Sequence, residues 1–121
     1  MSNEPFGCIV RMKVKPGHVE AFKKAAEATI AHAEQTEPGT AKYEWFLDEA
    51  QEHVVMREWF ATSDAAVPHF TGELPSKFFP ALFDHADLIG IDVTGNPTGP
   101  AKAVLDQFGA TYYPRMAGFT R

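Results

Sequence analysis

The chain has 121 residues, of which 45 % are hydrophobic and 22 % are charged. This composition is ordinary for a globular protein, and the length predicts a single domain over residues 1–121. The net charge is −5 at pH 7, which disfavours binding to nucleic-acid backbones and to anionic membrane surfaces.

The chain contains one cysteine, Cys8, so it can form neither an intramolecular disulfide nor a cysteine-based zinc site. The first five residues are polar and acidic and lack the pattern of a signal peptide. No stretch approaches the roughly 18 apolar residues that a membrane span requires. We therefore expect a cytoplasmic protein with no membrane partner.

Apolar residues at every second position over residues 6–14 predict a half-buried strand. Over residues 18–36 the apolar spacing changes to three and four residues, which is typical of an amphipathic helix. The sequence Glu37-Pro38-Gly39 should end this helix, because proline cannot continue it and glycine favours a turn.

Two strand-like runs, over residues 40–48 and 53–60, are separated by a short polar break, which predicts an antiparallel hairpin. Helix-capping residues at 62–64 predict a short helix that ends at Gly72. The remaining pattern predicts, in order, helical structure over 74–85, a strand over 88–94, a loop over 95–100, one or two helical turns over 101–108 and an extended segment over 110–119.

This order of elements, βαββαβ with a tail, is the ferredoxin-like α+β arrangement, in which helices cover one face of an antiparallel sheet. No remaining element of the chain is long enough to cover the other face. A second copy of the protein is the simplest cover, so we expect a homodimer.

The triplet Glu-Trp-Phe occurs twice within residues 42–60 and holds the only two tryptophans of the chain. A hairpin loop at residues 50–52 would pair the strands so that directly opposed residues share a face. A slip of one residue would destroy this sorting. One face would carry Tyr43, Trp45, Leu47, Val55, Arg57 and Trp59; the other would carry Lys42, Glu44, Phe46, Val54, Met56, Glu58 and Phe60.

An arginine among large aromatic rings suits a flat anionic or phenolic ligand, and Arg57 opposite Trp45 allows a cation–π contact. In the alternative interpretation, Arg57 extends past the rings to water and the tryptophans are ordinary core residues. The sequence leaves both interpretations open.

Among the five histidines, His69 is the best candidate for general acid–base chemistry, because it lies on the short helix expected to cover the hairpin and titrates near neutrality. His32, near the border of the apolar stripe of the first helix, is the next candidate. A histidine beside apolar residues is also often purely structural. His69 and Glu73 alone do not make a metal site, and we find no phosphate-binding or dinucleotide-binding motif.

Several stretches resemble the antibiotic biosynthesis monooxygenase domain family: VKPGHVEAFKKAA, EPGTAKYEWFLDE, VVMREWFATSDAAVPHF and the Gly-Phe near the C-terminus. The resemblance covers about residues 6–95, which leaves residues 96–121 as a C-terminal extension. It implies a homodimer whose two sheets form a dimeric α+β barrel, with a pocket between sheet and helices in each subunit.

Some members of the family oxidise quinols or polycyclic phenols with O₂ and without metal or flavin, so the resemblance implies a cofactor-independent monooxygenase. The alternative is a non-catalytic module for ligand binding or dimerisation. Haem-degrading members look to need an asparagine at the pocket, and neither Asn3 nor Asn96 lies on a pocket element. The family pattern makes Glu58 a structural or pocket carboxylate and His69 the pocket histidine.

We therefore expect His69 as the catalytic base and Arg57 as the partner of a substrate anion. We expect no cofactor and no metal. The residues expected to bind a small aromatic substrate are Tyr43, Trp45, Trp59, Phe22 and His32.

Overall fold

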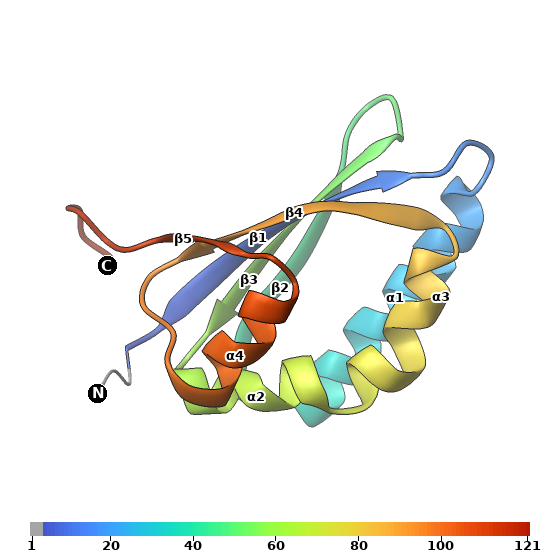
Figure 1. The fold of residues 1–121 in the computed structure, drawn as a ribbon. Helices are drawn as coiled ribbons and strands as arrows, with labels where there is room; N and C mark the ends of the chain where they lie inside the picture. The colour runs from blue at the N-terminus through green and yellow to red at the C-terminus, as the bar shows by residue number, and fades with distance from the viewer. Residues whose placement is uncertain (1–3) are drawn as a thin grey trace.

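The computed structural model describes residues 4–121, which form a five-stranded sheet with helices against it (Figure 1). The strands are β1 (Phe6–Val14), β2 (Thr40–Leu47), β3 (His53–Phe60), β4 (Ala86–Thr94) and β5 (Thr111–Tyr113). The helices are α1 (Val19–Thr36), α2 (Ser63–Thr71), the π-helix η1 (Leu74–Phe78), α3 (Phe79–Phe83) and α4 (Gly99–Gln107). Residues 1–3, including Asn3 and most of the segment judged not to be a signal peptide, lie outside the described part.

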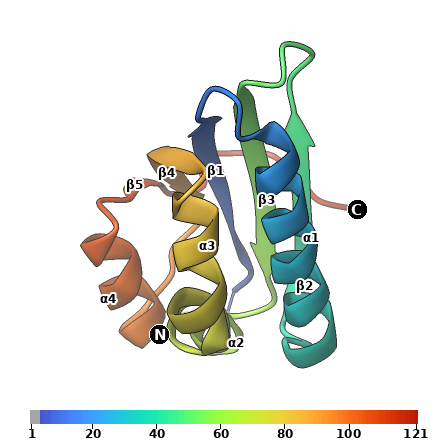
Figure 2. The ribbon, with the colours of Figure 1, turned by 90° about the vertical axis from the view of Figure 1, so that its right-hand side faces the viewer.

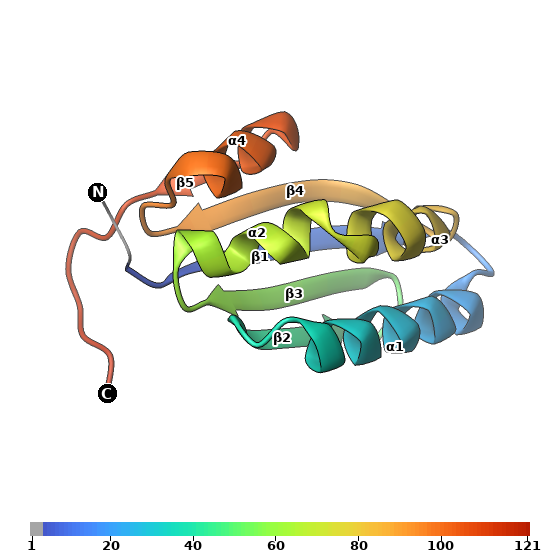
Figure 3. The same cartoon turned by 90° about the horizontal axis from the view of Figure 1, so that it is seen from below.

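The ferredoxin-like α+β class is confirmed. The strand order is β2-β3-β1-β4-β5, and all neighbours are antiparallel except β4 and β5, which are parallel. All four α-helices lie on one side of the sheet, with α1 near β2 and β3 and α4 near the β4–β5 edge (Figures 2 and 3). The sheet is open, and within residues 4–121 its other face carries no helix.

The buried residues follow the periodicities of the sequence. Helix α1 buries Phe22, Ala26, Thr29 and Ala33, which recur at three and four residues. Helix α2 begins where Thr62 accepts a hydrogen bond from the backbone N–H of Ala65 (3.0 Å), as expected of a capping threonine. Among residues 4–121, no helix is long and apolar enough to cross a membrane.

The register of β2 against β3 differs by one residue from the predicted one: Tyr43 lies opposite Glu58, and Trp45 lies opposite Met56. The physical reason is the loop, which spans more residues than 50–52. Asp48 accepts hydrogen bonds from the backbone N–H groups of residues 52 and 53 (2.8 and 3.1 Å), and residue 51 has a φ of 57°.

The predicted combination of β2 residues with β3 residues on each face was therefore wrong. Val54, Met56, Glu58 and Phe60 of β3 face the helices and are buried, and the half-buried Tyr43 and Trp45 of β2 face the same side. Arg57 and Trp59 instead face the uncovered side. There, Trp59 packs over Gly7, at which a Cβ atom would lie 2.8 Å from the indole ring.

Residues 96–121 add α4 and β5 to the family-like part of the fold. The Thr98 backbone N–H donates to Ser63 Oγ at the start of α2 (3.0 Å), and Leu105 of α4 is fully buried. The extended segment expected over residues 110–119 is a strand only at Thr111–Tyr113. Beyond it, the side chains of Met116 and Phe119 are exposed.

Candidate acid–base site

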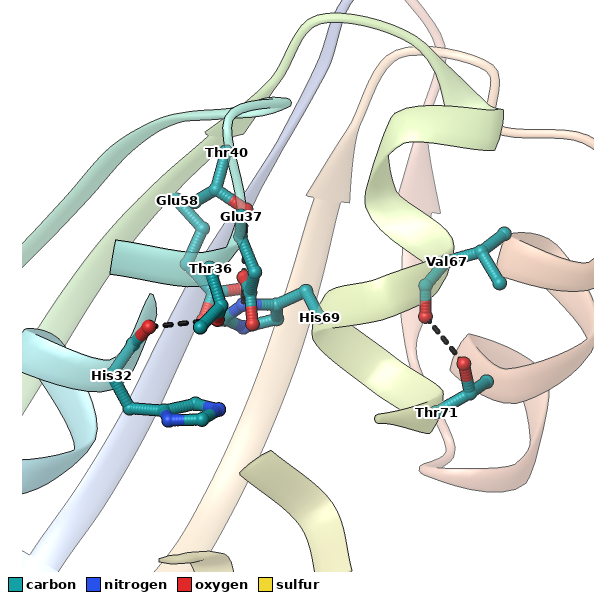
Figure 4. Close-up of polar contacts among 8 residues, drawn as sticks. All are labelled: His32, Thr36, Glu37, Thr40, Glu58, Val67, His69 and Thr71. Carbon is teal, nitrogen blue, oxygen red and sulfur yellow. Dashed lines mark hydrogen bonds and ion pairs between the residues drawn. The ribbon is translucent and has the colours of Figure 1, made fainter. Parts of the chain in front are cut away.

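His69 of α2 lies between two buried carboxylates (Figure 4). Its Nδ1 is 2.8 Å from Glu37 Oε1, and its Nε2 is 3.3 Å from Glu58 Oε2. His69 is 1 % exposed and each glutamate is 6 % exposed. The three residues come from α2, from the residue that follows α1, and from β3, so only the fold brings them together.

The sequence Glu37-Pro38-Gly39-Thr40 places the first carboxylate. Gly39 packs so closely on α2 that a Cβ atom there would lie 2.4 Å from the Cβ atom of Ala65. This close approach brings the end of α1 next to His69. Thr40 Oγ1 donates a hydrogen bond to Glu37 Oε1 (2.9 Å), so the oxygen that contacts His69 is fixed by a second partner.

The pKa of His69 is raised to about 9. Burial alone would lower it, because the charged imidazolium loses hydration. The negative charge of Glu58 and the hydrogen bond with Glu37 outweigh burial and favour the charged form. At neutral pH the site is therefore an imidazolium cation between two carboxyl groups.

Glu58 is less completely satisfied than Glu37. Its Oε1 is buried and accepts no hydrogen bond of ordinary geometry from a donor among residues 4–121, and the Cys8 thiol on the paired strand is only a weak donor to this carboxylate. Burial and then the charge of Glu58 raise the pKa values of the Cys8 thiol and the Tyr43 phenol, so both stay neutral. A buried carboxylate oxygen without a donor is costly, and a ligand hydroxyl group would supply that donor.

Glu58, His69 and Tyr43 form the polar end of an otherwise apolar cavity of about 50 Å³. The Tyr43 ring stands edge-on to the His69 ring, with centroids 4.8 Å apart. The remaining wall is contributed by the strands and by α2, α3 and the residue after α4, and includes Met12, Met56, Phe79, Leu82, Phe83 and Phe108.

The structure brings only two of the predicted site residues, His69 and Tyr43, into this wall. Trp45 faces the helices but packs against Phe22, with ring centroids 6.1 Å apart. The His32 ring stacks on Phe78 at 4.7 Å, and Figure 4 shows it pointing away from His69.

The remaining two predicted residues, Arg57 and Trp59, lie on the opposite face of the sheet, and Arg57 is exposed. They are separated from His69 because the register differs by one residue from the predicted one.

Glu37 is the functional candidate that the sequence pattern did not identify, since it looked like part of a helix stop. The sequence feature that could have identified Glu37 is the Glu-Pro-Gly-Thr stretch, in which an acidic residue directly follows an amphipathic helix. Within the part of the chain that the structure describes, no group of three or more histidine, cysteine, aspartate or glutamate side chains could hold a metal ion.

Comparison with known proteins agrees with this fold. The family model "Antibiotic biosynthesis monooxygenase" matches residues 5–78. No curated protein matches the chain. MupZ from Pseudomonas fluorescens shares 19 % identity and a TM-score of 0.82, over 98 % of this chain and 96 % of that one.

Two further structures are similar over less of the chain. A candidate antibiotic biosynthesis monooxygenase from Nitrosomonas europaea shares 21 % identity and a TM-score of 0.67, over 82 % of this chain and 98 % of its own. Rv0793 from Mycobacterium tuberculosis shares 16 % identity and a TM-score of 0.65, over 80 % and 99 %. Identities this low establish similarity of fold alone.

Proposed function

Since the chain belongs to the antibiotic biosynthesis monooxygenase family, we propose that it oxidises a phenol or quinol with O₂ and uses neither metal nor flavin. The observation that carries this proposal is the unpartnered Oε1 of Glu58 at the polar end of an apolar cavity. A phenol whose ring entered the cavity would donate its hydroxyl hydrogen to this oxygen.

Glu58 is the general base in this proposal. The sequence suggested His69, but a histidine whose pKa is about 9 already holds its proton at neutral pH. A carboxylate in the same hydrogen-bonded group has a free acceptor and can take the phenolic proton through Oε1. Positioned proton transfer of this kind contributes about 10²–10⁴-fold to a rate.

His69 supplies the positive charge that the sequence analysis had expected from Arg57. Its Nε2 lies 3.3 Å from Glu58 Oε2. The Glu58 carboxylate would therefore lie between the imidazolium and the substrate oxygen. When the proton moves to Glu58, the negative charge moves to the substrate, and the nearby cation favours that charge in surroundings of low dielectric constant.

The deprotonated ring then reacts with O₂ directly. It passes one electron to O₂, and the resulting pair recombines to form a carbon–oxygen bond. Conversion of a phenol to a quinone in this way consumes one O₂ and releases one water. The apolar walls support the step because they exclude bulk water from the electron-rich anion.

The test is oxygen consumption by purified protein with hydroquinones and phenols as substrates. Glu58→Gln removes the base but preserves shape, so the turnover rate should fall by about 10²–10⁴-fold. Glu73→Gln is the matched control, because Glu73 is exposed and pairs with Lys77 on the surface. A Glu58→Gln protein as active as the control would refute the proposed base.

We further propose that the protein is a homodimer joined through the uncovered face of the sheet. This face carries Phe46 and Ile89, which are 48 % and 57 % exposed, and the half-buried Trp59. Large exposed apolar side chains on one sheet face are typical of an interface. The family resemblance, which implies paired sheets, supports the same face.

A further inference from the structure

The wall of the cavity reaches the protein surface between α3 and the end of α4. Phe83 of α3 is 40 % exposed, and Phe79, Leu88 and Phe108 beside it are half-buried. Among the described wall residues, the only other one that is not fully buried is Tyr43, at the polar end. A ligand that approaches from the α3 side would therefore meet phenylalanine rings first and Glu58 last.

The cavity is small for an aromatic ligand. Its volume is about 50 Å³, whereas an engineered apolar cavity that binds benzene measures about 150 Å³. One ring can enter only if a wall side chain moves, and two fused rings require a still larger displacement. Phe83, with 40 % of its surface already exposed, has the least packing to lose.

Phe108, which follows the last residue of α4, is less exposed than Phe83. Its backbone N–H donates to the carbonyl oxygens of Val104 and Leu105 (3.2 and 3.1 Å), and the N–H of residue 110 returns to Leu105 (3.1 Å). Gly109 ends the helix with a φ of 73°, a conformation that glycine adopts readily. Leu105 accepts two of these hydrogen bonds and is fully buried, so the backbone that carries Phe108 is anchored to the core.

We propose that Phe83 and Phe108 determine the size of the substrate and restrict it to phenols and quinols with a single ring. This inference rests on the proposed function, since it takes a ring hydroxyl group to meet Glu58. It narrows the substrate class, because the fused rings of polycyclic phenols would collide with Phe108. Both residues lie outside residues 5–78, which the family model matches, and Phe108 belongs to the C-terminal extension.

The experiment measures binding of hydroquinone and of 1-naphthol, under anaerobic conditions, by calorimetry and by the NMR signals of the His69 imidazole. The wild-type protein should bind hydroquinone with a shift of the His69 signals and bind 1-naphthol at least about tenfold more weakly. Phe108→Ala should improve 1-naphthol binding by about tenfold or more. Phe119→Ala, at an exposed phenylalanine on the tail, should behave as wild type.

Two results would overturn the size rule: equal binding of both compounds by wild type, or no gain for 1-naphthol in Phe108→Ala relative to Phe119→Ala. If Phe108→Ala does not fold, Phe108→Leu is the milder variant and should show the same change in smaller measure. Binding needs no turnover, so an active Glu58→Gln protein would refute the proposed chemistry and leave the size rule standing. If the Phe108 variants keep the wild-type selectivity and Glu58→Gln is inactive, the proposed size selection is refuted and the proposed chemistry stands.

Discussion

Glu58 Oε2 lies 3.3 Å from Nε2 of His69, while Glu58 Oε1, on the same carboxylate, accepts no hydrogen bond of ordinary geometry within residues 4–121. One oxygen is therefore paired with a cation, and the carboxylate that carries the other lines an apolar cavity. Glu37 holds the opposite side of His69. In the proposed reaction, this asymmetry gives Glu37 a positioning role and Glu58 a chemical role.

Stability should fall as pH rises from about 6.5 to about 9. Between these values folded His69, with a pKa of about 9, keeps a proton that the unfolded chain, with a histidine pKa near 6.5, releases. The folded state binds more protons, so the free energy of unfolding decreases with pH, by up to about 3 kcal/mol. Urea unfolding at several pH values measures this slope.

The control for this pH dependence is His53→Gln. His53 also pairs with a carboxylate, that of Asp48 at 3.1 Å, but its side chain is half exposed. The slope should persist in His53→Gln and flatten in His69→Gln. A slope unchanged in His69→Gln would show that another group causes it.

Removal of either carboxylate should lower the pKa of His69, and Glu58→Gln should lower it more than Glu37→Gln. The reason is that the charge of Glu58 is the largest of the influences that raise this pKa. NMR titration of the His69 imidazole measures both changes. Glu34→Gln, at an exposed position of α1, is the control and should leave the titration curve in place.

Gly39→Ala should destabilise the protein by about 1–3 kcal/mol. The new Cβ atom would lie 2.4 Å from the Cβ atom of Ala65, so β2 and α2 must separate. The separation should also draw Glu37 away from His69 and lower the histidine pKa. Gly90→Ala is the control, because a Cβ atom at Gly90 meets nothing within 4 Å. Thermal unfolding that is equal in both variants would contradict the close approach at Gly39.

A charge on the uncovered sheet face should convert the proposed dimer to a monomer. Phe46→Asp and Ile89→Asp place carboxylates at apolar side chains that are now about half exposed, and a desolvated, unpaired charge opposes association. Sedimentation velocity at micromolar concentration measures the oligomeric state. Ala28→Asp, at an exposed position of α1 on the helical side, should leave the dimer intact. A wild-type protein that sediments as a monomer would refute the interface.

The sequence by itself determined the elements and the fold class. Alternation over residues 6–14 and the three-and-four spacing over residues 18–36 are local patterns, and each reports which side of a strand or helix is buried. Proline and glycine after Glu37 end α1 for equally local reasons. The order of the elements then left the ferredoxin-like sheet as the natural arrangement.

The tertiary structure alone decided the site. A turn held by Asp48 shifted the β2–β3 register by one residue, which turned Glu58 inward and Arg57 outward. The Glu37–His69 hydrogen bond joins residues that are 32 apart in the chain. The spacing of apolar residues within one strand or helix indicates which of its side chains face the core. It does not indicate which side chains of different elements are in contact. Those contacts depend on loop lengths and close backbone approaches, which only the folded chain fixes.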